Sequence, residues 1–145
     1  MVVEFSSVTI SFLIQATEDE ARLLDQVSNQ LQLSRENFSV EPMEGHFGNR
    51  ITVAKAHITG TEADRVTTVL MSSLSQQAKK TLVSELEKSL DEHDALYLRL
   101  DRQSLGSEWI GLSDEEPIRV KLKPRIRVGG RRSMMEQYTE LIQEA

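Results

Sequence analysis

The sequence contains no cysteine, and it has no long hydrophobic run. Without cysteine, disulfides, thiolate metal sites and cysteine nucleophiles are all excluded. No stretch of about 18 consecutive apolar residues is present, so the sequence predicts no transmembrane helix. The N-terminal residues also lack the basic region and apolar stretch of a secretory signal. We therefore expect a cytoplasmic protein that makes no membrane contact.

Aromatic residues are scarce, at 5% of the chain, whereas 39% of the residues are hydrophobic. That apolar content suffices for a packed core, and the length of 145 residues predicts a single domain over residues 1–145. No internal repeat or proline-rich linker divides the chain. Only Tyr97 and Trp109 are candidate rings for stacking on bases, and Trp109 is predicted to belong to the core. A sheet with several aromatic base platforms is not indicated.

The stretch from Pro117 to Val128 alternates strictly between apolar and basic residues. Because successive side chains of a strand point to opposite faces, the alternation predicts a half-buried strand with all its cations on one face. Neighbours on that face are about 6.6 Å apart. Pro124 cannot donate to a ladder, so the strand is expected to be an edge there, or to bulge or bend. The cations on this face are Arg119, Lys121, Lys123, Arg125 and Arg127.

The charge of the chain is polarised, although its net value is −6. Residues 117–132 contain seven of the 17 Lys and Arg and none of the 23 Asp and Glu, which leaves ten basic against 23 acidic residues elsewhere. A guard against edge-to-edge aggregation needs only one or two charges. The strip therefore favours an anion-binding surface that makes one oriented contact with a polyanion.

The remaining patterns predict an α+β fold with a mostly antiparallel sheet and helices packed on one face. Period-two alternation predicts strands, and leucine-rich stripes predict helices. The predicted capping boxes begin at Thr17 and Ser133. Strands are expected at residues 8–16, 38–40, 51–59, 96–101 and around 109–110, and helices at residues 17–33, from 61, 75–90 and from 133.

The polar sides of these strands would line the solvated face of the sheet. Lys55, His57, Tyr97 and Arg99 lie on polar sides and are expected to join the cations of residues 117–128 there. Arg131 and Arg132, at the start of a predicted helix, extend the basic strip. Cations fix phosphates and a ring stacks on a base, which is what single-stranded nucleic acid binding needs.

The three histidines do not have the spacing of metal ligands, and no metal or cofactor is expected. His46 lies in the glycine-flanked turn Glu44–Asn49, where a structural role is favoured over catalysis with Glu44. No nucleophile motif or phosphate-cradling loop is present. The sequence therefore predicts a protein that is not an enzyme, with His46 as the residue to test.

Four segments together resemble the archaeal RNA-binding protein family described as predicted exosome subunits. They are Ile10–Asp19, Glu44-Gly45-His46-Phe47-Gly48-Asn49, Leu96–Asp101 with Gln103, and Ile118–Lys123. The resemblance spans about residues 8–127. It implies a fold similar to large-subunit ribosomal protein five and a small, non-enzymatic RNA-binding protein. Residues 104–109 look shorter and more polar than the family pattern.

These observations predict an RNA-binding accessory protein, associated with the exosome or with ribosome-related proteins. Two alternatives stay open. In the first, the basic strip docks on an acidic protein partner or pairs edge to edge in a homodimer. In the second, the protein is an RNA-processing enzyme that uses His46.

Overall fold

A computed structural model of the chain describes residues 3–44, 48–126 and 129–145. Its strands are β1 (Phe5–Gln15), β2 (Phe38–Glu44), β3 (Arg50–Thr59), β4 (Leu96–Leu100) and β5 (Ile118–Pro124). Its helices are α1 (Glu20–Leu31), α2 (Thr61–Ser73), α3 (Gln76–Ser84), α4 (Leu86–Ser89) and α5 (Arg131–Gln143). Short 3₁₀ turns η1 (Arg35–Asn37) and η3 (Arg102–Ser104) precede β2 and follow β4.

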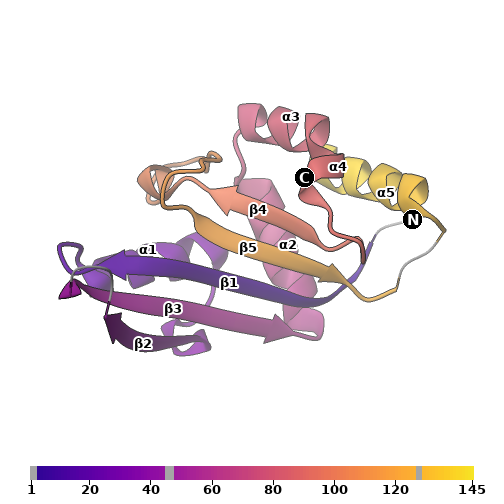
Figure 1. Cartoon of the computed structure of the whole chain (residues 1–145). Coiled ribbons are helices and arrows are strands. Elements are labelled where there is room, and N and C mark those ends of the chain that lie inside the picture. Colours follow the sequence, from indigo (N-terminus) through magenta and orange to yellow (C-terminus); the bar gives the residue numbers. More distant parts are fainter. Residues whose placement is uncertain (1–2, 45–47, 127–128) are drawn as a thin grey trace.

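The five strands form one antiparallel sheet in the order β2-β3-β1-β5-β4. Helices α1 and α2 cover one face, and α3, α4 and α5 lie beyond the β4 edge (Figure 1). Among the described residues, no helix crosses the strands on the opposite face of the sheet. This arrangement confirms the predicted α+β class.

The core lies between the covered face and the helices, where alternate strand residues meet the helical stripes. Val8, Ile10 and Phe12 of β1 and Val120 of β5 are buried there. Tyr138 of α5 is also buried, and its hydroxyl donates to the Asp94 carbonyl at 2.6 Å. Burial, with help from the Asp94 carboxylate, raises the pKa of Tyr138 far above its usual value. The hydroxyl therefore acts as a permanent donor that ties α5 to the segment before β4.

Strand β5 is an interior strand, because it pairs with β1 on one side and with β4 on the other. The pairing of β1 with β5 shifts register between Phe5 and Ser7, opposite the end that carries Pro124. The bulge predicted at Pro124 is thus present, and the edge position is excluded. A guard for an exposed edge cannot explain the cations of β5, since its neighbours already occupy both of its ladders.

Several predicted boundaries differ from the structure. Asp19 caps α1 instead of Thr17, and α5 begins after Gly130 without a side-chain cap from Ser133. The helix predicted over 75–90 is divided into α3 and α4 at Glu85. Residues 109–110 form only an isolated bridge through Ile110, and Trp109 is exposed, so the prediction that it belongs to the core is wrong.

Candidate nucleic-acid interface

The open face of the sheet is built from cross-strand rows of side chains. Residues paired across antiparallel strands share a face, so the register defines each row. One row, here called the arginine row, crosses all five strands. Its members in order are Ser39, Lys55, Ser11, Arg119 and Arg99. Three cations from three different strands therefore lie along one line.

A second row, here called the tyrosine row, lies two residues away from the arginine row on each strand that it crosses. It runs from His57 through Thr9 and Lys121 to Tyr97. The Thr9 hydroxyl and His57 Nδ1 are hydrogen-bonded at 3.0 Å. The Lys121 ammonium is 5.5 Å from the centroid of the Tyr97 ring, within cation–π range. Lys123, paired with Ser7, continues the cations of β5 by one more row.

The prediction that the polar sides of β3, β4 and β5 share one face is confirmed by this register. Arg99 faces the same side as Arg119, and Tyr97 the same side as Lys121. Within the described residues, the side chains of Lys55, Arg119 and Lys123 form no ion pair. These three charges are available to an external anion.

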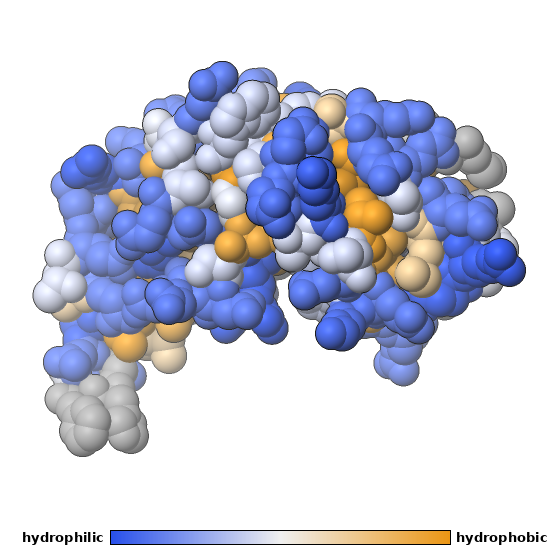
Figure 2. All heavy atoms as spheres, turned by 90° about the horizontal axis from the view of Figure 1, so that it is seen from above, coloured by the Kyte–Doolittle hydropathy of each residue, from blue (hydrophilic) through white to orange (hydrophobic). Residues whose placement is uncertain are grey.

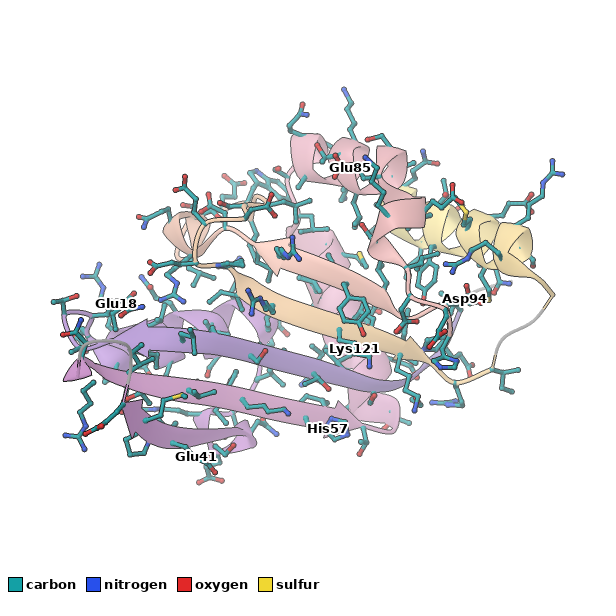
Figure 3. The ribbon with its side chains drawn as sticks, in the orientation of Figure 1. Glu18, Glu41, His57, Glu85, Asp94 and Lys121 are labelled. Atoms are coloured by element: carbon teal, nitrogen blue, oxygen red, sulfur yellow. The ribbon has the colours of Figure 1, made fainter. Side chains whose placement is uncertain are left out.

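A groove of about 1000 Å³ runs over this face and is walled by α3 and α4. The members of the arginine and tyrosine rows other than Ser39 and His57 form its floor, and Glu85, Asp91 and Asp114 add carboxylates along the wall. Figure 3 shows Lys121 and His57 in front of the sheet and Glu85 on the helices above it. Figure 2, seen from above, shows a mostly hydrophilic surface over these helices and an indented lower border where the open face lies.

The carboxylates of the wall orient two of the floor residues. Asp114 pairs with Arg99 at 3.1 Å, and Asp91 Oδ2 accepts from the Tyr97 hydroxyl at 3.1 Å. Burial alone would raise the pKa of Asp91, but hydrogen bonds from the Ala95 and His93 amides and from Tyr97 outweigh it, so the pKa is lowered overall. Asp91 therefore remains ionised and holds the Tyr97 hydroxyl by a hydrogen bond, with the ring beside Lys121.

The other predicted cations are placed elsewhere. After the strand ends at Pro124, Arg125 turns to Glu4 at 2.7 Å and to Asp64 of α2 at 3.2 Å, so its inclusion on the cationic face is wrong. Arg131 pairs with Asp94 at 3.2 Å and donates to the Asp91 carbonyl at 2.7 Å. These contacts join the start of α5 to the segment before β4. Arg132 is exposed on α5, 3.9 Å from Glu136. Arg127 lies outside the described residues.

Arg102 is an important residue that pattern reasoning missed. Its guanidinium is buried and donates to both Glu18 carboxylate oxygens at 2.7 and 2.8 Å and to the Leu13 and Glu116 carbonyls. The Asp101-Arg102-Gln103 segment after a strand was the only signal in the sequence. It did not show that the side chain would turn inward.

The structure does not place His46, which lies outside the described residues together with Gly45 and Phe47. Among the described residues, no group of three or more His, Asp or Glu side chains could hold a metal ion. Within those same residues, no helix is long and apolar enough to span a bilayer.

The fold and this face define a class, an α+β protein whose open antiparallel sheet carries rows of cations. A family model described as RNA binding matches residues 7–124, and the chain belongs to this RNA-binding family. The chain is similar to an RNA-binding protein of Pyrococcus abyssi, with 29% identity over 123 residues covering 81% of this chain and 80% of the relative.

Solved structures show the same fold. The chain is similar to a DUF54 protein of Archaeoglobus fulgidus, with 26% identity and a TM-score of 0.77 over 95% of this chain and 99% of that one. A DUF54 protein of Methanothermobacter thermautotrophicus, 21% identical, has a TM-score of 0.75 over 95% and 98% of the two chains. The homologues named here are archaeal. The predicted likeness to ribosomal protein five stays a prediction.

Proposed function

We propose that this protein binds RNA on the open face of its sheet, with phosphates lying along the cations of β3 and β5. The observation that carries the proposal is the arginine row, in which Lys55 and Arg119 from separate strands align without internal partners among the described residues. Phosphate contacts of this kind dominate the affinity of proteins for nucleic acids. Family membership supports RNA as the polyanion.

The proposed protein is an accessory binder without catalytic activity. The open face presents cations, hydroxyls, His57 and one ring, with the carboxylates of Glu85, Asp91 and Asp114 along its wall. RNA bound there should be recovered intact after incubation. Association with the exosome or ribosome-related proteins, docking on an acidic partner and homodimer formation stay predictions.

Replacing Arg119, Lys121 and Lys123 by Ala tests the proposal, because these cations of β5 face the open side. Each lost phosphate contact lowers the slope of log affinity against log salt by about 0.7 for a single strand. The triple variant should therefore lose about two units of slope and bind RNA weakly. The measurement is fluorescence anisotropy over a salt series.

A matched control removes three exposed cations from outside the open face, Arg22 on α1, Arg35 on η1 and Lys80 on α3. Both variants change the net charge equally, so a general charge effect would weaken them alike. A retained slope in the β5 variant, or an equal loss in the control, would refute the proposed face.

A further inference from the structure

A second hollow opens on the sheet beside the arginine row. It has a volume of about 250 Å³, and we call it the leucine recess. Leu13 of β1 and Val53 of β3 are cross-strand neighbours in its wall, and Pro117 adds a third apolar surface. Arg119 borders both this recess and the large groove. An apolar site therefore lies directly next to a cation that is available to a phosphate.

The leucine recess is held rigid by the buried Arg102. Its Nη2 donates to the Leu13 carbonyl at 2.6 Å, and its Nε donates to the Glu116 carbonyl at 3.0 Å. Glu116 has a φ of 41°, a left-handed conformation that a residue other than glycine adopts only when its surroundings enforce it. The hydrogen bonds of Arg102 thus fix both sides of the recess before any ligand arrives.

The rim of the leucine recess is polar. Gln15 Nε2 donates to Glu116 Oε1 at 3.3 Å on the exposed side. A carboxylate and an amide at the mouth of an apolar site can exchange hydrogen bonds with the edge of a nucleobase. Figure 3 places Glu18, the carboxylate partner of Arg102, where β1 ends. The recess therefore lies at one end of the sheet, beside the rows of cations.

We propose that the leucine recess holds one unstacked base of a single-stranded RNA whose phosphate is bound by Arg119. This inference rests on the proposed function, and it selects single strands as the substrate class. A nucleotide joins a flat ring with apolar faces to an anion, which matches an apolar recess bordered by the Arg119 guanidinium, a group that forms no ion pair among the described residues. In an A-form duplex the bases are stacked inside the helix and cannot enter such a recess.

The substitution Leu13→Asn tests this inference. Leu13 is 44% exposed, so replacing its side chain should disturb the core little. We expect an unstructured single-stranded oligomer to bind wild type more tightly than the same strand annealed to its complement. Leu13→Asn should weaken single-strand binding about five- to tenfold, the effect of about 1 to 1.4 kcal/mol of lost apolar contact. The salt slope should not change, because no phosphate contact is lost.

Met43→Asn is the matched control. Met43 is 50% exposed on the same face, but it lies on β2 and does not line the leucine recess. This variant should bind both RNA forms as wild type does. Unchanged binding by Leu13→Asn, or an equal loss on single strand and duplex, would overturn the inference. If the variant that lacks Arg119, Lys121 and Lys123 still showed a reduced salt slope, the proposed function would stand although the inference failed. If that variant kept the wild-type salt slope as well, both would fail.

A second measurement keeps the inference testable if Leu13→Asn fails to fold. A single 2-aminopurine is moved along the oligomer, and its fluorescence is followed on binding to wild-type protein. One position should brighten, because its base leaves the stack. If no position brightens, no base is unstacked, and the inference is wrong whatever the variant does. If Arg119→Ala abolishes the signal while Met43→Asn preserves it, the base lies beside Arg119.

Discussion

Arg102 joins three parts of the chain at one end of the sheet. Its side chain is 8% exposed and pairs with Glu18 while donating to the Leu13 and Glu116 carbonyls. Breaking a buried pair by removing one partner leaves the other charge uncompensated. We therefore expect Arg102→Ala to lower the free energy of unfolding by about 3 kcal/mol.

Urea denaturation measures this change, and Arg132→Ala serves as its control. The Arg132 side chain is 96% exposed and lies 3.9 Å from Glu136. Its loss should alter the free energy of unfolding by less than about 0.5 kcal/mol. Equal effects of the two substitutions would show that the buried position of Arg102 contributes nothing special.

Tyr97 combines a ring for stacking with a hydroxyl that donates to Asp91. If a base stacks on this ring, Tyr97→Ala should weaken RNA binding by about 1–3 kcal/mol. The salt slope should stay near that of wild type, because stacking releases no counterions. Tyr97→Phe keeps the ring and should bind RNA nearly as wild type does. Anisotropy titrations of both variants decide this: an equal loss in Tyr97→Phe would assign the effect to the Asp91 hydrogen bond.

At the scale of elements, the strands could be predicted because period-two alternation records which face is buried. Arg119, Lys121 and Lys123 were placed on the correct face for this reason. The same reasoning failed at Arg125, since a strand pattern says nothing of where pairing stops. Pro124 ends β5, and the side chain of Arg125 then pairs with the carboxylate of Asp64, which lies 61 residues away in the sequence.

Helix ends and irregular segments were harder to predict, because several local partners compete for them. Thr17 and Asp19 are both suitable caps, but the structure holds Glu18 in a turn through the Gln15 amide and Arg102, and Asp19 accepts from the Arg22 amide to begin the helix. Trp109 looked like a core residue from its type, but Ile110 takes the buried position through its bridge to Leu74. The recess walls were also beyond prediction, because they join residues about 100 positions apart.

The turn between β2 and β3 depends on the conformation of Gly48. Its φ is 74°, a value that costs an L-residue energy, and a Cβ there would meet no atom within 4 Å. The cost of Gly48→Ala is therefore conformational, and we expect a loss of about 1 kcal/mol in unfolding free energy.

Gly130→Ala is the control for this turn, because Gly130 has a φ of −91° and equally open surroundings. Thermal melts of the two variants measure the difference. The expected order is a clear loss for Gly48→Ala and a smaller loss for Gly130→Ala, where only the N-cap preference for Gly over Ala at the start of α5 is affected. A reversed order would mean that the left-handed conformation of Gly48 is not required.

At the scale of the whole molecule, the fold converts a linear strip into a surface with contributions from three strands. The chain is acidic overall, at −6, yet Lys55, Arg119 and Lys123, which form no ion pair among the described residues, lie together on one face. The carboxylates of the groove wall should keep phosphates toward β1, β3 and β5, away from α4. This separation predicts that RNA meets the molecule from one side only.

Lysine labelling tests that orientation directly. Lys55, Lys121 and Lys123 carry their amines on the open face, whereas Lys80 is exposed on α3. Acetylation in the presence of saturating RNA should be slowed at the three open-face lysines and unchanged at Lys80, as read by mass spectrometry of proteolytic peptides. High salt should remove the protection, because it releases the phosphate contacts. Protection that is equal at all four lysines would indicate wrapping or aggregation, and protection of Lys80 alone would move the interface to the helices.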